Sequence, residues 1–390
     1  MPLRVSRFRI ALGMLLLLGF SNHPQAHDAG SYGGVFRSRD FGATWLNADV
    51  GLFLNAPLAI AIDPQAPFHL LMGTDIGLLS SHNGGRSWTV EARDLIVGPV
   101  FAVAFLPGGR QALCATQNGV FRLEAEGWTP VRVPASALPA RSFASGAGNR
   151  LYLLGADQLL GSDDGGQSFA TLRQTAGEIT VLVVIGANRE TMLAVIEGTV
   201  MASDDGGRAW RPTDFGSRNE PVDVITLDAK LPERVWGAHA DRIYRSDDRG
   251  ATWVPVGRPL PELGTKVRGI AADETATTLV LTTHRGTYRS SDAGGTWVLQ
   301  EGSLPGHLEA GPLARDPSDP SVIYISYSLV PYMQIWRAAR EGSPVVTRLD
   351  PVDLAGVAAF ALLLLLGGGL ATRGLMRLRN AASASGGQFR

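Results

Sequence analysis

Acidic side chains recur in this sequence within one eight-residue pattern, Ser-x-Asp-x-Gly-x-Thr-Trp, where they could act as catalytic carboxylates or calcium ligands. The pattern occurs six times between Ser38 and Trp297. Its third position holds Asp40, Asn83, Asp164, Asp205, Asp248 and Asp292. Its last position holds an aromatic ring, in Trp45, Trp88, Phe169, Trp210, Trp253 and Trp297.

The residue types of the pattern are also those of a tight turn. A carboxylate at the third position can accept hydrogen bonds from the backbone amides of its own turn. The glycine permits the positive φ of such a turn, and the ring offers a large apolar area to a neighbouring sheet. A calcium loop would need a further glutamate that is missing here. We therefore expect these residues to be structural, and we expect no catalytic residue, metal or cofactor.

The spacing of the pattern predicts the fold. Successive third-position residues are 43, 81, 41, 43 and 44 residues apart, and 81 is close to two periods. A decayed copy is therefore expected near residue 124, where Gly119–Trp128 keeps the strand and the tryptophan but loses the turn. A period of about 40–45 residues is typical of four-stranded propeller blades.

Each period contains two predicted β-hairpins. The outer hairpin includes the turn pattern, and the inner one has a proline-bearing turn, as in IAIDPQAPFHLLMGT. Inner hairpins are expected to begin near residues 57, 100, 140, 178, 222, 267 and 311, and an eighth outer hairpin is expected at 334–346. The hairpin around Ser38 should complete the last blade and close the ring. The sequence thus predicts an all-β, seven-bladed propeller, with eight blades as the alternative.

The two ends of the chain indicate a membrane. Arg4, Arg7 and Arg9 precede an apolar run at 10–20, which is typical of a signal peptide; an uncleaved signal-anchor is the alternative. The uncharged segment 354–372 would span about 28 Å as a helix. Arginines follow this segment, so its C-terminal side should be cytoplasmic; a buried helix is the alternative. We expect a signal peptide at 1–26, a propeller at 30–348, a transmembrane helix at 354–372 and a cytoplasmic tail at 373–390.

Composition limits the compartment and the partners. The formal net charge is -1, which gives no electrostatic reason to expect nucleic acid as a partner. The one cysteine, Cys114, rules out an internal disulfide framework, and the sequence has no Asn-x-Ser/Thr acceptor. We therefore expect a protein of the bacterial inner membrane, with its propeller on the periplasmic side.

The repeated SDDGGxTW boxes resemble the Asp-box, or BNR, repeats of sialidases, sortilin-type receptors, xyloglucan hydrolases and the photosystem II assembly-factor family. One ring of seven blades behind a signal peptide is most similar to the assembly factors. The resemblance covers roughly residues 33–340 and implies a role in the assembly or stability of a membrane-protein complex. The predicted C-terminal transmembrane helix departs from that family's soluble members.

The loops opposite the Asp boxes contain the candidate functional residues. Candidate acids for a glycosidase, which needs two facing carboxylates, are Asp75, Asp157, Glu197 and Asp241. Candidate partner-binding cations are Arg141, Arg218, Lys266, Arg268 and Arg285. The arginine-containing motif that a resemblance to sialidases would imply is missing from the body of the chain. We therefore expect a membrane-anchored, non-catalytic module that binds an integral membrane protein or complex, with a sialidase- or xyloglucanase-type glycoside hydrolase as the alternative.

Overall fold

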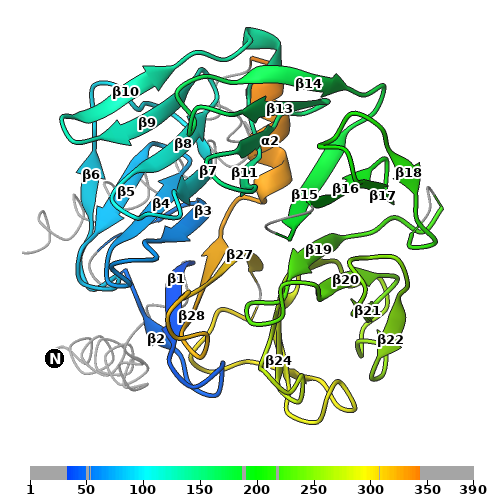
Figure 1. The fold of residues 1–390 in the computed structure, drawn as a ribbon. Coiled ribbons are helices and arrows are strands. Elements are labelled where there is room, and N and C mark those ends of the chain that lie inside the picture. The colour runs from blue at the N-terminus through cyan, green and yellow to red at the C-terminus, as the bar shows by residue number, and fades with distance from the viewer. Residues whose placement is uncertain are drawn as a thin grey trace, which may run out of the picture. The chain divides into compact units, whose positions relative to one another are not determined.

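The computed structural model describes residues 33–49, 52, 54–186, 190–216, 219–306 and 308–342. Within these residues, seven antiparallel sheets of four strands are arranged radially around one axis (Figure 1). The predicted signal peptide, transmembrane helix and cytoplasmic tail lie outside the described residues. Among the described helices, none has both the length and the apolar character needed to cross a membrane. The chain divides after Glu341 into two units, of which the first contains the propeller.

We number the blades along the chain. Blade 1 contains β3 (Pro57–Ile62), β4 (Leu70–Thr74), β5 (Leu78–Ser81) and β6 (Thr89–Glu91). Blade 2 contains β7 (Val100–Phe105), β8 (Ala112–Thr116), β9 (Val120–Glu124) and β10 (Gly127–Val131). Blade 3 follows a 3-10 turn, η2 (Ala135–Ala137), and contains β11 (Ser142–Ser145), β12 (Leu151–Leu154), β13 (Gln158–Ser162) and β14 (Ala170–Gln174).

The remaining blades repeat this order. Blade 4 contains β15 (Ile179–Ile185), β16 (Thr191–Ile196), β17 (Thr199–Ser203) and β18 (Arg211–Pro212). Blade 5 contains β19 (Val224–Leu227), β20 (Val235–His239), β21 (Arg242–Ser246) and β22 (Val254–Val256). Blade 6 contains β23 (Val267–Ala272), β24 (Leu279–Thr283), β25 (Gly286–Ser290) and β26 (Val298–Leu299). Blade 7 contains β27 (Glu309–Arg315), β28 (Ile323–Ser328), β1 (Gly34–Ser38) and β2 (Leu46–Asn47).

The ring closes through strands from the two ends of the propeller, which confirms the prediction of seven blades. β1 pairs with β28 from Gly34 opposite Tyr327 to Ser38 opposite Ile323. The inner strands begin within two residues of the predicted positions. The decayed copy in blade 2 is a tight hairpin in which Gly127 lies opposite Glu124.

The predicted eighth outer hairpin at 334–346 is wrong. Residues Tyr332–Arg340 form an α-helix, α2, instead of strands. Ile335, Trp336 and Ala339 are buried on one side of it, whereas Arg337 and Arg340 lie in its last turn. This spacing is that of an amphipathic helix and not the two-residue alternation of a strand.

The antiparallel order of the strands gives the ring two different faces. The face that we call the Asp-box face carries the turns between the third and fourth strand of each blade, together with those between the first and second strand. The other, which we call the loop face, carries the turns between the second and third strand and the connections between blades. The chain leaves β28 toward the loop face, and α2 follows there.

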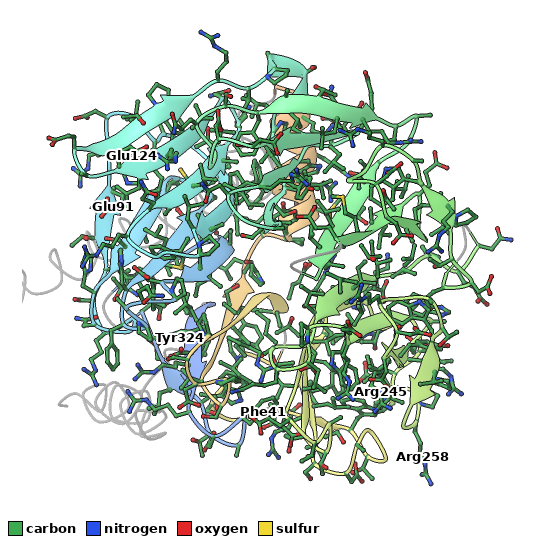
Figure 2. All side chains as sticks on the ribbon, viewed as in Figure 1. Phe41, Glu91, Glu124, Arg245, Arg258 and Tyr324 are labelled. Atoms are coloured by element: carbon green, nitrogen blue, oxygen red, sulfur yellow. The ribbon has the colours of Figure 1, made fainter. Side chains whose placement is uncertain are left out.

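The core lies between adjacent blades. One buried cluster joins Leu113 of blade 2 to Leu153 of blade 3, and another joins Ile243 of blade 5 to Ile270 of blade 6. Side chains fill the spaces between the sheets (Figure 2). The last-position rings belong to this packing: Trp45, Trp88 and Phe169 are buried, and Trp210, Trp253 and Trp297 are half-buried.

Candidate functional site: the loop face

The Asp-box turns engage their own acidic side chains. In blade 3, the backbone N–H groups of Gln167 and Ser168 donate to Asp164 Oδ1 at 2.9 and 3.1 Å. The hydroxyls of Ser162 and Ser168 donate to the same carboxylate, each at 2.6 Å. Burial acts to raise the pKa of Asp164, but these hydrogen bonds outweigh it and lower the pKa to about 2.

The same backbone contact recurs in the other five copies. The N–H four residues along donates to the side-chain oxygen of each third-position residue. The distances are 2.8–2.9 Å for Asp40, Asn83, Asp205, Asp248 and Asp292. The six copies of the motif therefore place their side-chain oxygens in hydrogen bonds within the turn, and none of them points into a cavity shared by all the blades.

The four candidate glycosidase acids belong to different blades of the loop face. Asp75 accepts a hydrogen bond from Asn55 Nδ2 at 2.8 Å, and Asp241 accepts one from the Gly264 N–H at 2.9 Å. Asp157 and Glu197 lie in the corresponding turns of blades 3 and 4. A cavity of about 410 Å³ is lined by Glu197 but by none of the other three acids. The four residues are therefore not brought into one pocket.

The sequence analysis missed two acids on this face, namely Asp49, whose pKa burial raises to about 6, and Asp223. Burial raises the pKa of Asp223 to about 6, against opposing contributions from the Val267 N–H, Lys266 and Arg268. The Val267 N–H lies 3.2 Å from Asp223 Oδ2. The position of Asp223, directly before the inner strand of blade 5, is a signal that could have placed it on the loop face.

The structure separates the five candidate cations. Arg141 lies beneath α2, where its side chain is 6% exposed and forms an ion pair with Glu178. Its guanidinium lies 4.3 Å from the ring centre of Trp336, and burial lowers its pKa. The side chain of Arg141 is therefore buried in this structure, and its role in partner binding stays a prediction. Arg218 lies outside the described residues.

The other three cations lie together at blade 6. Arg268 forms an ion pair with Glu309 at 3.1 Å, and Arg285 forms one with Glu262 at 2.7 Å. Lys266 is exposed, and its backbone N–H donates to His284 Nδ1 at 3.0 Å. We call this region the open patch; its residues are Asp223, Glu262, Lys266, Arg268, Arg285 and Glu309.

The helix α2 covers the loop face at blades 2 and 3. Trp336 is fully buried and meets the ring of Phe101, at the start of blade 2, edge-on at 5.0 Å. Gln117, in the turn between β8 and β9, donates to the Ala339 carbonyl at 3.3 Å. The loop face therefore has a part that lies under α2 and a part outside α2, which contains the open patch.

An exposed ion pair such as Arg285–Glu262, whose side chains are 41% and 48% exposed, contributes little to folding stability. Complementary charges do, however, determine which partner is accepted and how fast it associates. The open patch has the chemistry of a recognition surface.

The fold and this face define a seven-bladed β-propeller with a charged, partly covered loop face. No family model matches the chain. An 82-residue stretch, 21% of the chain, is 35% identical to the vacuolar protein sorting/targeting protein 10 of Fusarium vanettenii, and the match spans 5% of that protein.

Solved structures of low sequence identity share the fold. YCF48 from Cyanidioschyzon merolae is 13% identical with a TM-score of 0.55, over 70% of this chain and 96% of that one. YCF48 bound to D1 peptide is 16% identical with a TM-score of 0.52, over 71% and 94%. The GH74 xyloglucanase from Xanthomonas campestris is 16% identical with a TM-score of 0.56, over 72% of this chain and 52% of that one. These similarities establish the β-propeller fold, which a YCF48 and a xyloglucanase both have, and leave the activity to be argued from the surface.

Proposed function

We propose that this protein is a membrane-anchored, extracytoplasmic scaffold of the Asp-box type that binds an integral membrane protein or complex. Its role would be to assist the assembly or the stability of that complex. The observation that supports this most is the open patch, where Arg268 is paired with Glu309 of blade 7, Arg285 is paired with Glu262, and Lys266 is exposed beside them. One similar structure, YCF48 bound to D1 peptide, shows that a propeller of this fold can bind a peptide.

The membrane part of the proposal rests on the sequence. The signal peptide at 1–26 would export the propeller, and the apolar segment 354–372 would anchor it with its tail in the cytoplasm. Anchoring by one helix raises the effective concentration of a membrane partner, so that individual contacts can be weak.

The test is affinity purification of the full chain from detergent-solubilised membranes. Wild type is compared with Lys266→Glu/Arg285→Glu, which reverses two exposed charges of the open patch. The matched control is Arg39→Glu/Arg86→Glu, which reverses two exposed charges on the Asp-box face. We expect one integral membrane protein in stoichiometric amount with wild type and control, and about tenfold less with the open-patch variant. Equal recovery with both variants, or no membrane protein with wild type, would overturn the proposal.

The alternative is a glycoside hydrolase, favoured by one observation. Asp223 has a pKa raised to about 6 and lies near enough to Asp241 to feel its charge. A raised pKa is what a general acid needs. Turnover of an aryl glycoside by the wild-type protein, lost in Asp223→Asn with an unchanged melting temperature, would establish this activity instead.

A further inference from the structure

Arginine side chains close the gap between neighbouring blades at three places on the Asp-box face. Each arginine is on the third strand of its blade, and its guanidinium donates to a carbonyl in the Asp-box turn of the next blade. The bonds run from Arg37 to Gly84, from Arg122 to Gly165 and from Arg289 to Phe41, each at 3.1 Å. The acceptor is always the residue after the third position, and its φ is positive at 54–70°. We call this contact the arginine latch.

Between blades 3 and 4 the latch has no arginine. Gly161 occupies the latch position on β13, opposite Tyr152, just as Arg37 lies opposite Tyr324 in blade 7 (Tyr324 is labelled in Figure 2). The corresponding acceptor is Gly206, whose φ of 74° is like that of the other acceptors. No donor among the described residues is bonded to the Gly206 carbonyl.

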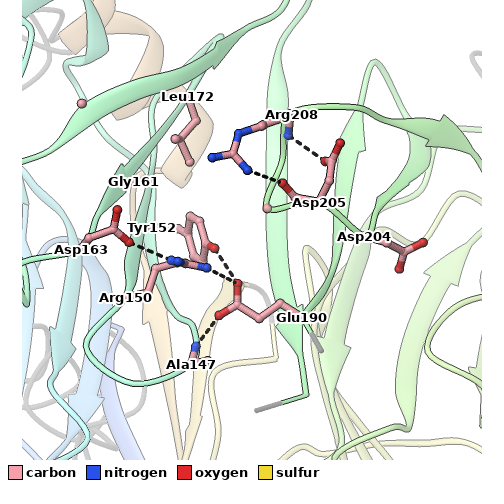
Figure 3. A pocket seen from close by; sticks show the side chains of 12 residues that line it. Ala147, Arg150, Tyr152, Gly161, Asp163, Leu172, Glu190, Asp204, Asp205 and Arg208 are labelled. Carbon is pink, nitrogen blue, oxygen red and sulfur yellow. Dashed lines mark hydrogen bonds and ion pairs between the residues drawn. The ribbon is translucent and has the colours of Figure 1, made fainter. Parts of the chain in front are cut away.

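A cavity of about 490 Å³ lies where the missing arginine would be, and both Gly161 and Gly206 line it (Figure 3). A bulge in the pairing of β13 with β14 leaves Leu172 without a partner on β13, and its side chain lies over Gly161. Figure 3 shows Leu172 on one side of the cavity and Asp205 and Arg208, from the Asp-box turn of blade 4, on the other. We call it the vacant slot.

The vacant slot is lined by an excess of acidic groups. Four carboxylates and two guanidiniums line it, which gives the lining a formal charge of −2; the charged residues are Asp163, Glu190, Asp204, Asp205, Arg150 and Arg208. Arg211, outside the lining, forms an ion pair with Asp204 at 3.4 Å. Glu190 is the most deeply placed acid, with a side chain 8% exposed. The Tyr152 hydroxyl donates to it at 2.7 Å, and the Ala147 N–H also donates to it. Arg150 lies 3.4 Å from the same carboxylate.

Other blades also lack the latch, and a smaller cavity of about 280 Å³ is lined by Ala202 at the latch position of blade 4. Blades 1 and 4 have Ser80 and Ala202 at the latch position. In blade 5 the arginine is present but pairs with Asp247 of its own turn at 3.0 Å. An arginine of the fourth strand does cross this interface, because Arg173 Nη1 donates to the Arg208 carbonyl at 3.2 Å. The interface of blades 3 and 4 still combines a missing third-strand arginine, a Gly206 carbonyl with no donor among the described residues, a cavity and an acidic lining.

We propose that the vacant slot binds the guanidinium of an arginine supplied by a partner protein. The planar guanidinium carries five N–H donors, which suits a carbonyl and carboxylates held around one cavity. Three latches within this chain already show an arginine in the equivalent position. This site lies on the face opposite the open patch, so it is independent of the function proposed above.

The first test fills the slot from within the chain. In Gly161→Arg, the new Cβ would meet only the end of the Leu172 side chain, at 2.7 Å, and Leu172 is exposed enough to move aside. The φ of Gly161 is not positive, so an arginine is compatible with the backbone. We expect a melting temperature equal to or above that of wild type, because the new side chain can form the latch with Gly206.

Binding is measured on the full chain in detergent by saturation-transfer NMR, with N-acetyl-arginine N-methylamide as the probe. The citrulline analogue, which has the same shape but no charge, is the matched control ligand. We expect a saturable signal with the arginine probe at least about fivefold stronger than with citrulline, and its loss in Gly161→Arg. Equal signals from the two probes, or an undiminished signal in a folded Gly161→Arg, would overturn the proposal.

A second variant tests the proposal in case Gly161→Arg does not fold. Asp163→Asn/Asp204→Asn changes two solvent-accessible acids of the slot, whose side chains are 85% and 37% exposed. Asp247→Asn, at the same motif position in blade 5, is the control. We expect the arginine signal to fall about threefold or more in the double variant and to stay unchanged in the control. A signal that is the same in both variants would place the probe elsewhere and contradict the proposal.

Discussion

Asp164 on the Asp-box face and Asp223 on the loop face have pKa values shifted in opposite directions. On the Asp-box face, amide and hydroxyl donors of the turn lower the pKa of Asp164 to about 2. On the loop face, burial raises the pKa of Asp223 to about 6, although one backbone N–H and two nearby cations act against it. The difference shows that the number of donors supplied by the local backbone, and not the residue type, decides whether an acid holds the scaffold or stays available for chemistry.

Replacement of Trp336 should have the largest effect on stability, because this side chain anchors α2 to the loop face. Trp336 is fully buried against Phe101 and Arg141. We expect Trp336→Ala to weaken the docking of α2 by about 3–5 kcal/mol, the usual cost of truncating a buried tryptophan. Hydrogen exchange at 332–340 should rise strongly, while exchange in the strands of blades 5 and 6 stays slow. Unchanged exchange at 332–340 would show that α2 is held by other contacts.

Replacement of one Asp-box serine should have the next largest effect on stability. This serine lies on the Asp-box face, opposite α2. The Ser246 hydroxyl accepts from the Gly250 N–H and donates to Asp248, both at 2.8 Å, in a buried position. We expect Ser246→Ala to lower the free energy of unfolding by about 1–3 kcal/mol, because the buried amide of Gly250 loses its acceptor. Thr275→Ala, at an exposed turn of the neighbouring blade, is the control and should cost less. Equal losses in chemical denaturation would contradict a special role for the motif.

Stability should depend on pH with opposite signs on the two faces. The pKa of Asp223 is raised in the folded state, so its folded form holds the proton longer and stability falls as pH rises from about 4 through 6. The pKa of Asp164 is lowered, so its contribution is present above about pH 4 and is lost as pH falls toward 2. Asp223→Asn should flatten the first part of the profile and Asp164→Asn the second, in urea denaturation measured against pH. If both variants changed the pH profile of stability in the same way, the two faces would not differ in the direction of their pKa shifts.

Exposed cations of the open patch should affect folding least. Lys266→Ala is expected to change the free energy of unfolding by less than about 0.5 kcal/mol, because its side chain is exposed and forms no ion pair with another described residue. Its effect should appear in the association rate with the membrane partner and in the salt dependence of that rate. A large loss of thermal stability in Lys266→Ala would show that the patch is part of the scaffold.

The sequence was sufficient to predict the blades and the closure of the ring. The Asp-box spacing identified each outer hairpin, and the surplus hairpin around Ser38 identified the strands that complete blade 7. These features are local and repeated, so each copy supports the others. The same template led to the error at α2, because IWR in 335–337 resembles the strand motif RIYRS, although Ile335, Trp336 and Ala339 have helical spacing.

The surface could be predicted only in part. The topology puts Arg141, Lys266, Arg268 and Arg285 on one face as expected, but the sequence did not show that α2 covers Arg141. The vacant slot was also overlooked, although one signal for it was readable. Strands that end in GVFRS, RIYRS and GTYRS carry an arginine before the serine, and QLLGS carries Gly161 there. Its acidic lining comes from blades 3 and 4 together, which no single repeat reveals.

The central claim is that the membrane partner binds the loop face, while the third-position side chains of the Asp boxes stabilise their own turns on the opposite face. A bulky maleimide–polyethylene glycol can be attached at Lys266→Cys on the loop face or at Ala251→Cys on the Asp-box face, both of them exposed positions. The one natural cysteine, Cys114, is buried, and burial raises its pKa, so it should not react. The account predicts that modification at position 266 abolishes capture of the membrane partner and that modification at 251 does not. Capture lost only upon modification at 251 would contradict it.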